Sequence, residues 1–216
     1  MSSASKTDRV RAVRGDRLIE IVAVLMLGVA TVGSAWCGYQ ASQWNGKQDD
    51  EARAATDARV EASRQFGLAT QKVAYDASMV AQYAQAFIDG NTKLTDFYRS
   101  TLFRPEFLPV VQRWEDQVRA GGTPPTNLFQ DPQYLTEVFT DYTKAQATAD
   151  ADTAKASEAG SLGDDYVLTT LLLASALFFA GVTTSFRMRV PRLMLLAAAG
   201  LIIAYAASRL VTLDVA

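Results

Sequence analysis

The chain has 216 residues, a formal net charge of -2, one cysteine and no histidine. Without histidine it lacks the commonest acid–base catalyst and the commonest metal ligand, and a single cysteine cannot form an intrachain disulfide. Residues 45–165 carry 12 basic and 19 acidic side chains, and an acidic region of this kind does not suit nucleic-acid binding.

An apolar run at residues 18–40 predicts a first transmembrane helix. Its first 20 residues, Leu18–Cys37, contain one charged side chain, Glu20, near their start. At a rise of ~1.5 Å per residue this length matches the ~30 Å hydrocarbon core of a bilayer. Trp36, Tyr39 and Trp44 lie at its end, and we expect them to anchor the helix at the membrane–water interface.

Residues 1–17 contain five basic and two acidic side chains and no apolar period, so we expect a disordered cytoplasmic tail. A cleavable signal peptide is the alternative, because a basic segment, an apolar run and Gly33-Ser34-Ala35 resemble such a leader. The apolar run is longer than the ~7–15 residues of a typical leader, which favours an uncleaved anchor.

Residues 41–165 are predicted to form an extracytoplasmic helical domain. A first long helix is indicated by large apolar residues that recur every seven positions with alanines between them: Phe66, Val73, Val80 and Phe87. Gly90 is expected to end this helix and Asn91 to cap the next one. Two short helices follow at about 92–102 and 107–119, separated by a break at Arg104-Pro105-Glu106, and residues 121–125 predict a loop.

Asp131 and Pro132 predict the start of a second long helix, as N-cap and first helical residue. The two long helices must be antiparallel if both enter the same bilayer. Matching their membrane ends sets Phe66 opposite the neighbourhood of Thr140, and Val73 near Gln133. We therefore expect a stalk lined by alanines, capped by an apolar head at residues 90–130.

Residues 166–186 and 193–213 predict the second and third transmembrane helices, and the turn between them, residues 187–192, is basic. Because basic residues concentrate on the cytoplasmic side, the N-terminal tail and this turn are predicted to be cytoplasmic, with residues 41–165 outside. The predicted fold class is all-α, in an integral protein of the cell (inner or plasma) membrane. It combines three transmembrane helices with an extracytoplasmic antiparallel helical hairpin or bundle.

Each predicted span carries small residues four positions apart, which let helices approach closely in lipid. These candidate transmembrane packing residues are Ala30, Ser34, Gly38, Ala176, Ala180, Gly200, Ala204 and Ser208. One interpretation is the seam of an oligomer or the wall of a pore. The alternative, which we favour, is contacts among three helices of one chain, or chance in alanine-rich spans. Charged residues lie near the span ends, which argues against a path for ions or protons.

Acidic clusters at Asp49-Asp50-Glu51, Asp150/Asp152 and Asp164-Asp165 offer oxygen ligands of the kind that Ca²⁺ or Mg²⁺ prefers. The sequence has no twelve-residue calcium loop, and we favour a solvated surface for these carboxylates. It also has no nucleophile elbow, phosphate loop or zinc motif. We therefore predict no catalytic residue, no metal site and no cofactor.

Arg104, Phe107 and Trp114 are the candidate partner-binding residues, because arginine and aromatic side chains dominate the energetics of protein interfaces. The alternative, which we favour, is that these residues form the core and corner of the helical head.

Three segments resemble a family of uncharacterised bacterial membrane proteins with three spans. They are Trp36-x-x-Tyr39-Gln40-Ala41-x-x-Trp44-x-Gly46, Asp96-Phe97-Tyr98-Arg99 and Phe103-Arg104-Pro105-Glu106-Phe107, and the basic turn before the last span is similar too. The resemblance covers most of the chain. It implies the same membrane topology, and it leaves the function open because no activity can be carried over from the family.

These observations favour a non-enzymatic interaction or sensory module, whose head meets a protein partner and whose stalk relays the position of the head to the spans. The alternative is a homo-oligomeric channel or membrane scaffold assembled through the small-residue faces. The expected partners are the lipid bilayer together with a second copy of the chain or another protein, and no nucleic acid.

Overall fold

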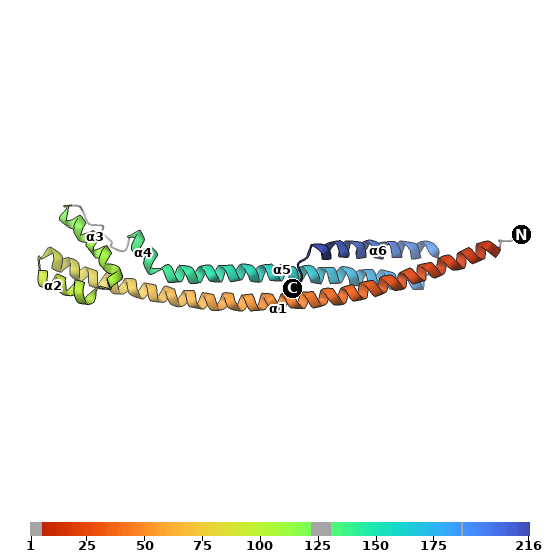
Figure 1. Ribbon diagram of the computed structural model, residues 1–216, viewed down its shortest axis with the longest axis horizontal. Coiled ribbons are helices and arrows are strands. Elements are labelled where there is room, and N and C mark those ends of the chain that lie inside the picture. Colours follow the sequence, from red (N-terminus) through yellow and green to blue (C-terminus); the bar gives the residue numbers. More distant parts are fainter. Residues whose placement is uncertain (1–5, 122–130, 187) are drawn as a thin grey trace. The chain divides into compact units, whose positions relative to one another are not determined.

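The computed structural model describes residues 6–121, 131–186 and 188–216, and for residues 6–16 it describes the backbone alone. It is 92% helical, and the described residues contain no strand, which confirms the all-α fold class. The helices, in chain order, are α1 (Lys6–Ile88), α2 (Thr92–Phe97), the π-helical turn η1 (Tyr98–Leu102), the 3₁₀ turn η2 (Pro105–Phe107), α3 (Leu108–Arg119), α4 (Pro132–Val138), α5 (Thr140–Val182), the 3₁₀ turn η4 (Thr183–Ser185) and α6 (Arg189–Thr212) (Figure 1).

The chain divides into two compact units. Unit 1 contains the residues up to Ala52 and from Ala154 onward, and unit 2 contains Arg53–Thr153. Helices α1 and α5 each contribute residues to both units, and α6 belongs to unit 1 alone.

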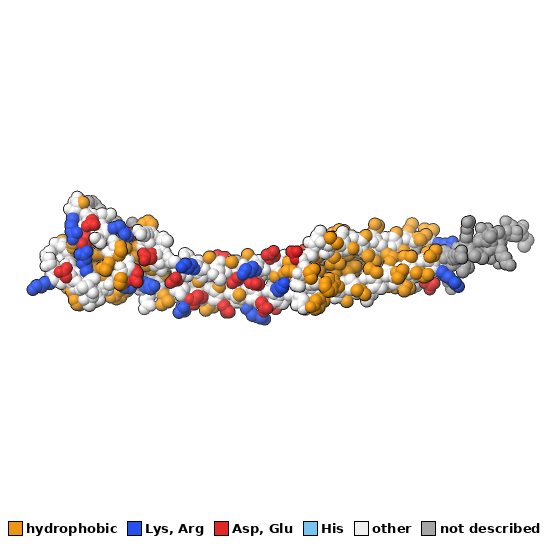
Figure 2. Space-filling model, viewed as in Figure 1, with side chains coloured by type: hydrophobic (Ala, Val, Ile, Leu, Met, Phe, Trp, Pro, Cys, Tyr) orange, Lys and Arg blue, Asp and Glu red, His pale blue; other side chains and the backbone are white. Residues whose placement is uncertain are grey.

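Helices α1, α5 and α6 are long enough to cross a membrane, and each contains an apolar stretch of 18 residues, with mean hydropathies of 2.2, 1.9 and 1.9. The fully buried residues between these helices include five alanines, Ala30, Ala176, Ala180, Ala199 and Ala206, beside the larger Tyr166 and Leu173. Large apolar side chains such as Val32 and Leu201 point outward, and Figure 2 shows this part of the surface covered by hydrophobic side chains. Small residues inside and bulky apolar residues outside are typical of helices that pack in lipid.

The register of unit 1 follows from close contacts between its helices. A Cβ added at Gly33 would lie 3.0 Å from Leu173, so α1 and α5 approach closely there. A Cβ at Gly200 of α6 would lie 3.3 Å from the end of the Met26 side chain. Farther along, the amide of Ala216 donates to the Gln40 side chain at 3.2 Å. Helices α1 and α6 therefore run parallel, and α5 runs antiparallel to both.

Both predicted cytoplasmic segments are more helical than expected. Helix α1 begins at Lys6, which corrects the expectation of a disordered tail for residues 6–17. A stable apolar helix provides the nucleus, and each further residue adds one backbone hydrogen bond. Helix α6 begins at Arg189, so the turn predicted at 187–192 is shorter, and Pro191 lies in the first turn of α6, where proline is tolerated. Residues 1–5 and Arg187 lie outside the described residues.

In unit 2, α1 and α5 form an antiparallel hairpin. The buried residues of α1 recur every seven positions along one face: Ala55, Ala62, Ala69, Asp76 and Tyr83. Phe66 packs against Phe139 and Tyr142, with ring centroids 5.8 and 5.4 Å apart. This contact confirms the predicted pairing of Phe66 with the neighbourhood of Thr140.

The head of unit 2 has an aromatic core formed by the end of α1 and the short helices. The buried members are Val80, Tyr83, Tyr98, Phe103, Phe107, Val110, Val111, Trp114 and Tyr134. Tyr83 lies near the centre, with its ring centroid 5.1 Å from that of Phe103 and 6.1 Å from that of Tyr98, both edge-on. Edge-on pairs of this kind contribute roughly 0.5–1.5 kcal/mol each beyond the area they bury.

Local sequence signals set the ends of these helices as predicted. Gly90 has a positive φ of 69° after α1, and the Asn91 side chain accepts from the amide of Leu94 as the N-cap of α2. Asp131 accepts from two backbone amides at the start of α4, as predicted, but the long helix predicted from Pro132 is divided at Phe139 into α4 and α5. The helix predicted at 92–102 divides into α2 and the π-helical turn η1. Gly121, with φ 73°, begins the predicted loop, and residues 122–125 of that loop lie outside the described residues.

Candidate functional site

The structure places the three candidate partner-binding residues inside the head. Phe107 is fully buried and Trp114 retains 7% of its exposure, so both are core residues and neither offers a surface to a partner. The Arg104 side chain is 23% exposed and pairs with Asp76. The arrangement agrees with the alternative in which they form the core and corner of the head. The predicted head extends to residue 130, and residues 122–130 lie outside the described part of the chain.

Arg104 belongs to a buried carboxylate cluster, which we call the Asp76 cluster and which contains Asp76, Arg104 and Tyr134. Asp76 on α1 is completely buried. Its carboxylate accepts from Arg104 through both Nε, at 3.1 Å, and Nη2, and it accepts from the Tyr134 hydroxyl at 2.6 Å. Three donors surround one charge, which is what a carboxylate needs when it leaves water. The cluster ties α1 to the turn before η2 and to α4.

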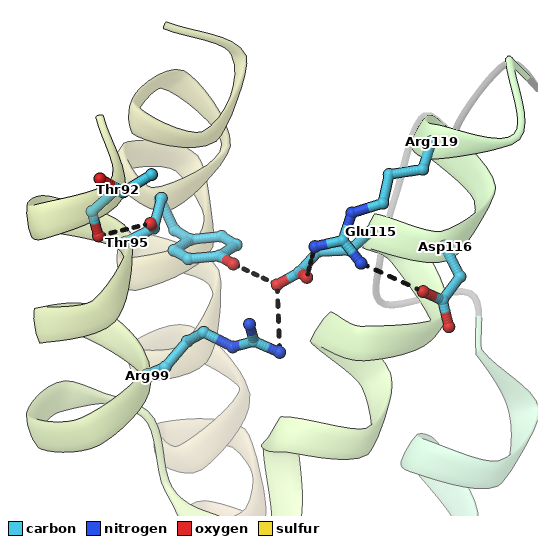
Figure 3. A network of polar contacts seen from close by, with 7 residues as sticks. Thr92, Thr95, Arg99, Glu115, Asp116 and Arg119 are labelled. Atoms are coloured by element: carbon cyan, nitrogen blue, oxygen red, sulfur yellow. Dashed lines mark hydrogen bonds and ion pairs between the residues drawn. The ribbon is translucent and has the colours of Figure 1, made fainter. Parts of the chain in front are cut away.

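A second buried carboxylate lies between α1, η1 and α3, and Figure 3 shows its contacts. Glu115 is completely buried, and the hydroxyl of Tyr83 donates to its Oε1. Arg119 donates to Oε2 at 2.9 Å, and Arg99 forms an ion pair with Oε1 at 3.5 Å. We call these four residues the Glu115 cluster. Both arginines are partly exposed, so the cluster reaches from the aromatic core to solvent.

Both tyrosines are held in the protonated form. Burial, followed by the hydrogen bond to Glu115, raises the pKa of Tyr83 well above its usual range. Burial and the hydrogen bond to Asp76 do the same to the pKa of Tyr134. The hydrogen bond to Asp76 also raises the pKa of Arg104. Each cluster therefore joins a buried carboxyl group to arginine and to a protonated tyrosine, and these contacts hold α1 to the rest of the head.

A polar girdle joins the three helices of unit 1 at the end of α6. The carbonyl of Asp214 accepts from Trp44 Nε1 and from the Tyr166 hydroxyl, each at 3.1 Å. The amide of Ala216 donates to Gln40, whose side chain is 1% exposed. The girdle therefore fixes residues 213–216 against α1 and α5. Arg209 adds an ion pair with Asp165.

The predicted interfacial aromatics lie around the same end. Trp36 and Tyr39 are half-exposed and in contact, with ring centroids 6.1 Å apart. Trp44 is only partly exposed, because it contacts the Asp214 carbonyl, and Lys47 lies 4.3 Å above its ring. These positions suit side chains with an apolar body and a polar edge.

Of the eight predicted small packing residues, five are buried or partly buried and three are exposed. Ala30, Ala176 and Ala180 are fully buried between helices of the same chain, and Ser34 and Gly200 are partly buried. Gly38, Ala204 and Ser208 are exposed. The most buried residues of α6 are Ala199 and Ala206, seven residues apart, and Leu196 and Ile203 also lie on its packed face.

The acidic clusters are dispersed over the described surface. Glu51 pairs with Lys155 at 3.8 Å, and Asp165 pairs with Arg209. Among the described residues, no three cysteine, aspartate or glutamate side chains lie close enough together to hold a metal ion.

Sequence reasoning missed Asp76 and Glu115 as core residues. Asp76 has a detectable signal, because it continues the seven-residue spacing of Ala55, Ala62 and Ala69. Glu115 has a weaker one, since it adjoins Trp114 and has an arginine four residues later. Comparison with models of protein families, with curated proteins and with solved structures found no match.

Proposed function

We propose that this is an integral protein of the cell membrane with unit 2 outside the cytoplasm. The apolar surface of the three helices of unit 1 supports membrane insertion. The basic residues of the N-terminal segment and of residues 187–192 support a cytoplasmic location for both. The resemblance of the sequence to bacterial three-span membrane proteins of unassigned activity agrees with this topology.

Within this frame, the protein acts as a non-enzymatic interaction or sensory module. One observation carries the proposal: α1 is a single uninterrupted helix that supplies both a membrane-type helix of unit 1 and the buried Asp76 and Tyr83 of the head. A partner that repacks the head must act on these α1 contacts. A helix hydrogen-bonded at every turn passes a shift along its axis with little loss, which gives a physical route from head to spans.

The partner surface is then sought among the exposed apolar residues of the head. Leu94 and Phe97, three residues apart on α2, are 40% and 50% exposed. Residues three apart on a helix lie on the same face, and the exposed Phe97 ring offers the kind of anchor that binding hot spots use. These residues replace Phe107 and Trp114 as contact candidates.

A photo-crosslinking residue placed at Phe97 in cells tests this function. We expect one adduct of defined mass from position 97, lost when Leu94 is changed to Asp, and none from the exposed control position Ala147 on α5. Equal labelling from positions 97 and 147, or an adduct that survives Leu94→Asp, would reject a specific partner surface on α2.

The second candidate is a homo-oligomeric channel or scaffold. It is favoured by one observation: Gly38, Ala204 and Ser208 stay exposed after the three helices of unit 1 have packed together. The lipid-corrected mass in a nanodisc separates the two functions. A defined oligomer that dissociates with Ala204→Leu supports the scaffold, and a monomer rejects it.

A further inference from the structure

We propose that the exposed face of α2 binds the same face of a second copy of this chain, across a twofold axis. The inference rests on the proposed interaction module, because it names the partner of the surface that Leu94 and Phe97 form. It does not depend on the small-residue faces of unit 1.

The exposed face of α2 has one charged edge and one apolar edge. Of the six described residues of α2, Thr95 alone is buried, so the opposite side of this helix faces solvent. At 3.6 residues per turn, Lys93 and Asp96 lie along one edge of the exposed side. Leu94 and Phe97, which are 40% and 50% exposed, lie along the other edge.

The two charges of this face are not used within the described parts of the chain. Neither Lys93 nor Asp96 forms an ion pair there, and both side chains are exposed. Arg99, three residues after Asp96, pairs instead with the buried Glu115 of the core. Two opposite charges therefore remain available side by side on one edge of α2.

A second copy of α2 is complementary to this pattern. A twofold axis across the middle of α2 makes the two copies antiparallel and sets each edge against the same edge of the other copy. Lys93 then faces Asp96 of the second copy, and Asp96 faces its Lys93. On the other edge, Leu94 lies beside Phe97 of the second copy. A strongly acidic or basic partner would instead meet one attractive and one repulsive charge along the same edge.

The size of this face determines where the contact forms. A stable dimer in solution buries about 800 Å² per partner, and a helix of six residues supplies only part of that area. Anchoring both copies in one membrane raises their effective concentration and so lowers the affinity that the contact must supply. We therefore expect the two copies to pair in a bilayer and to separate in dilute detergent.

Photo-crosslinking of the purified full-length protein in liposomes tests the proposal. A photoreactive phenylalanine derivative replaces Phe97 and keeps its aromatic ring, and we expect an adduct with twice the mass of one chain. Lys93→Asp and Asp96→Lys should each lower the yield of this adduct by about tenfold, because twofold symmetry counts each reversed charge twice. Lys144→Asp, which reverses an exposed charge on α5, is the matched control and should leave the yield unchanged.

Restoring the charge pairs identifies the partner as a second copy. The double variant Lys93→Asp/Asp96→Lys should recover the adduct, and so should a mixture of the two single variants that carry different tags. Both combinations again place opposite charges face to face. An unchanged yield in the single variants, or no recovery in either combination, would overturn the twofold pairing.

A comparison with crosslinking in cells separates this inference from the proposed function. An adduct between position 97 and a different protein in cells, with none between copies in liposomes, would overturn the second copy as the partner and leave the interaction module standing. The absence of any adduct from position 97 in both settings would reject the module together with the inference.

Discussion

Removing Arg104 is expected to destabilise unit 2 strongly, because it leaves the charge of Asp76 buried with one donor in place of three. Asp76 has no exposed surface, and Arg104 supplies two of its hydrogen bonds. Breaking a buried pair by removing one partner typically costs about 3–5 kcal/mol. The Arg104 side chain is 23% exposed, so water can reach part of the vacated space and the expected cost lies near the lower value, about 3 kcal/mol.

The assay is urea unfolding of the full-length protein in detergent, followed by the fluorescence of Trp114. The chain has three tryptophans, so Trp36→Phe and Trp44→Phe provide a background in which the signal reports the head alone. With a typical slope of about 2 kcal/mol per molar urea, Arg104→Met should lower the unfolding midpoint by about 1.5 M. Arg64→Met, which breaks an exposed pair with Glu61, is the matched control and should leave the midpoint unchanged.

A double variant decides whether the buried charge causes the loss. Asp76→Asn combined with Arg104→Met removes the charge and keeps an acceptor for Tyr134, so it should be about 1–2 kcal/mol more stable than Arg104→Met alone. If the double variant is no more stable than the single one, lost packing of the Arg104 side chain explains the effect. If Arg104→Met shifts the midpoint no more than the Arg64 control, the reasoning about Asp76 is wrong.

Three other predictions follow from the contacts of the described residues. Tyr83 and Tyr134 keep their protons in the folded state, whereas the unfolded chain releases them above about pH 10. The contribution of both tyrosines to the free energy of unfolding should therefore be fully present below that pH. Above about pH 10 the free energy of unfolding should fall by up to about 1.4 kcal/mol per pH unit for each tyrosine. The prediction is contradicted if the urea midpoint of the wild type depends on pH no more than that of the double variant Tyr83→Phe/Tyr134→Phe. Gly163→Val should lower the thermal stability of unit 1 more than Gly181→Val. An added Cβ at Gly163 would lie 2.5 Å from the Asn45 side chain, whereas one at Gly181 meets no atom within 4 Å among the described residues. Equal melting temperatures of the two variants would refute this prediction. Asp131→Ala should cost about 1 kcal/mol in urea unfolding through loss of the α4 cap, and Asp131→Asn, which keeps a cap, should cost less.

The helix ends could be predicted from sequence because their causes are local. Gly90, Asn91, Asp131 and Pro132 each act on backbone groups within a few residues, and the structure has all four in the expected positions. The pairing of Phe66 with α5 could be predicted for a different reason: two helices expected to enter one bilayer must be antiparallel, and matching their predicted membrane ends gives the register.

The buried face of α1 could be predicted only approximately. Choosing the large apolar residues as its centre led to Phe66 and Val73, yet Phe66 is half-exposed, and the most buried seven-residue series contains Ala62, Ala69 and Asp76. Small residues mark the centre of a close helix contact, and large ones flank it. An aspartate continuing an alanine series is then a signal for a buried charge whose partners come from elsewhere.

The carboxylate clusters themselves could not be predicted, because their members are far apart in sequence. Arg104 lies 28 residues and Tyr134 58 residues from Asp76. The sequence shows each as a surface charge or a core aromatic, and only the folding of α3 and α4 onto α1 brings them together. The same reason explains why the sequence makes Arg104 a candidate for partner binding, although in the structure it is committed to Asp76.

The two units owe their stability to different interactions, and this difference bears on function. Unit 1 buries small side chains such as Ala30 and Ala176, which let its helices approach closely, and adds polar contacts to the Asp214 carbonyl at one end. The head instead fixes α1 through Asp76 and through Tyr83 with Glu115, contacts whose geometry tolerates little displacement. A partner that repacks the head must therefore break or move these specific contacts. The proposed interaction module requires such a specific event at the head.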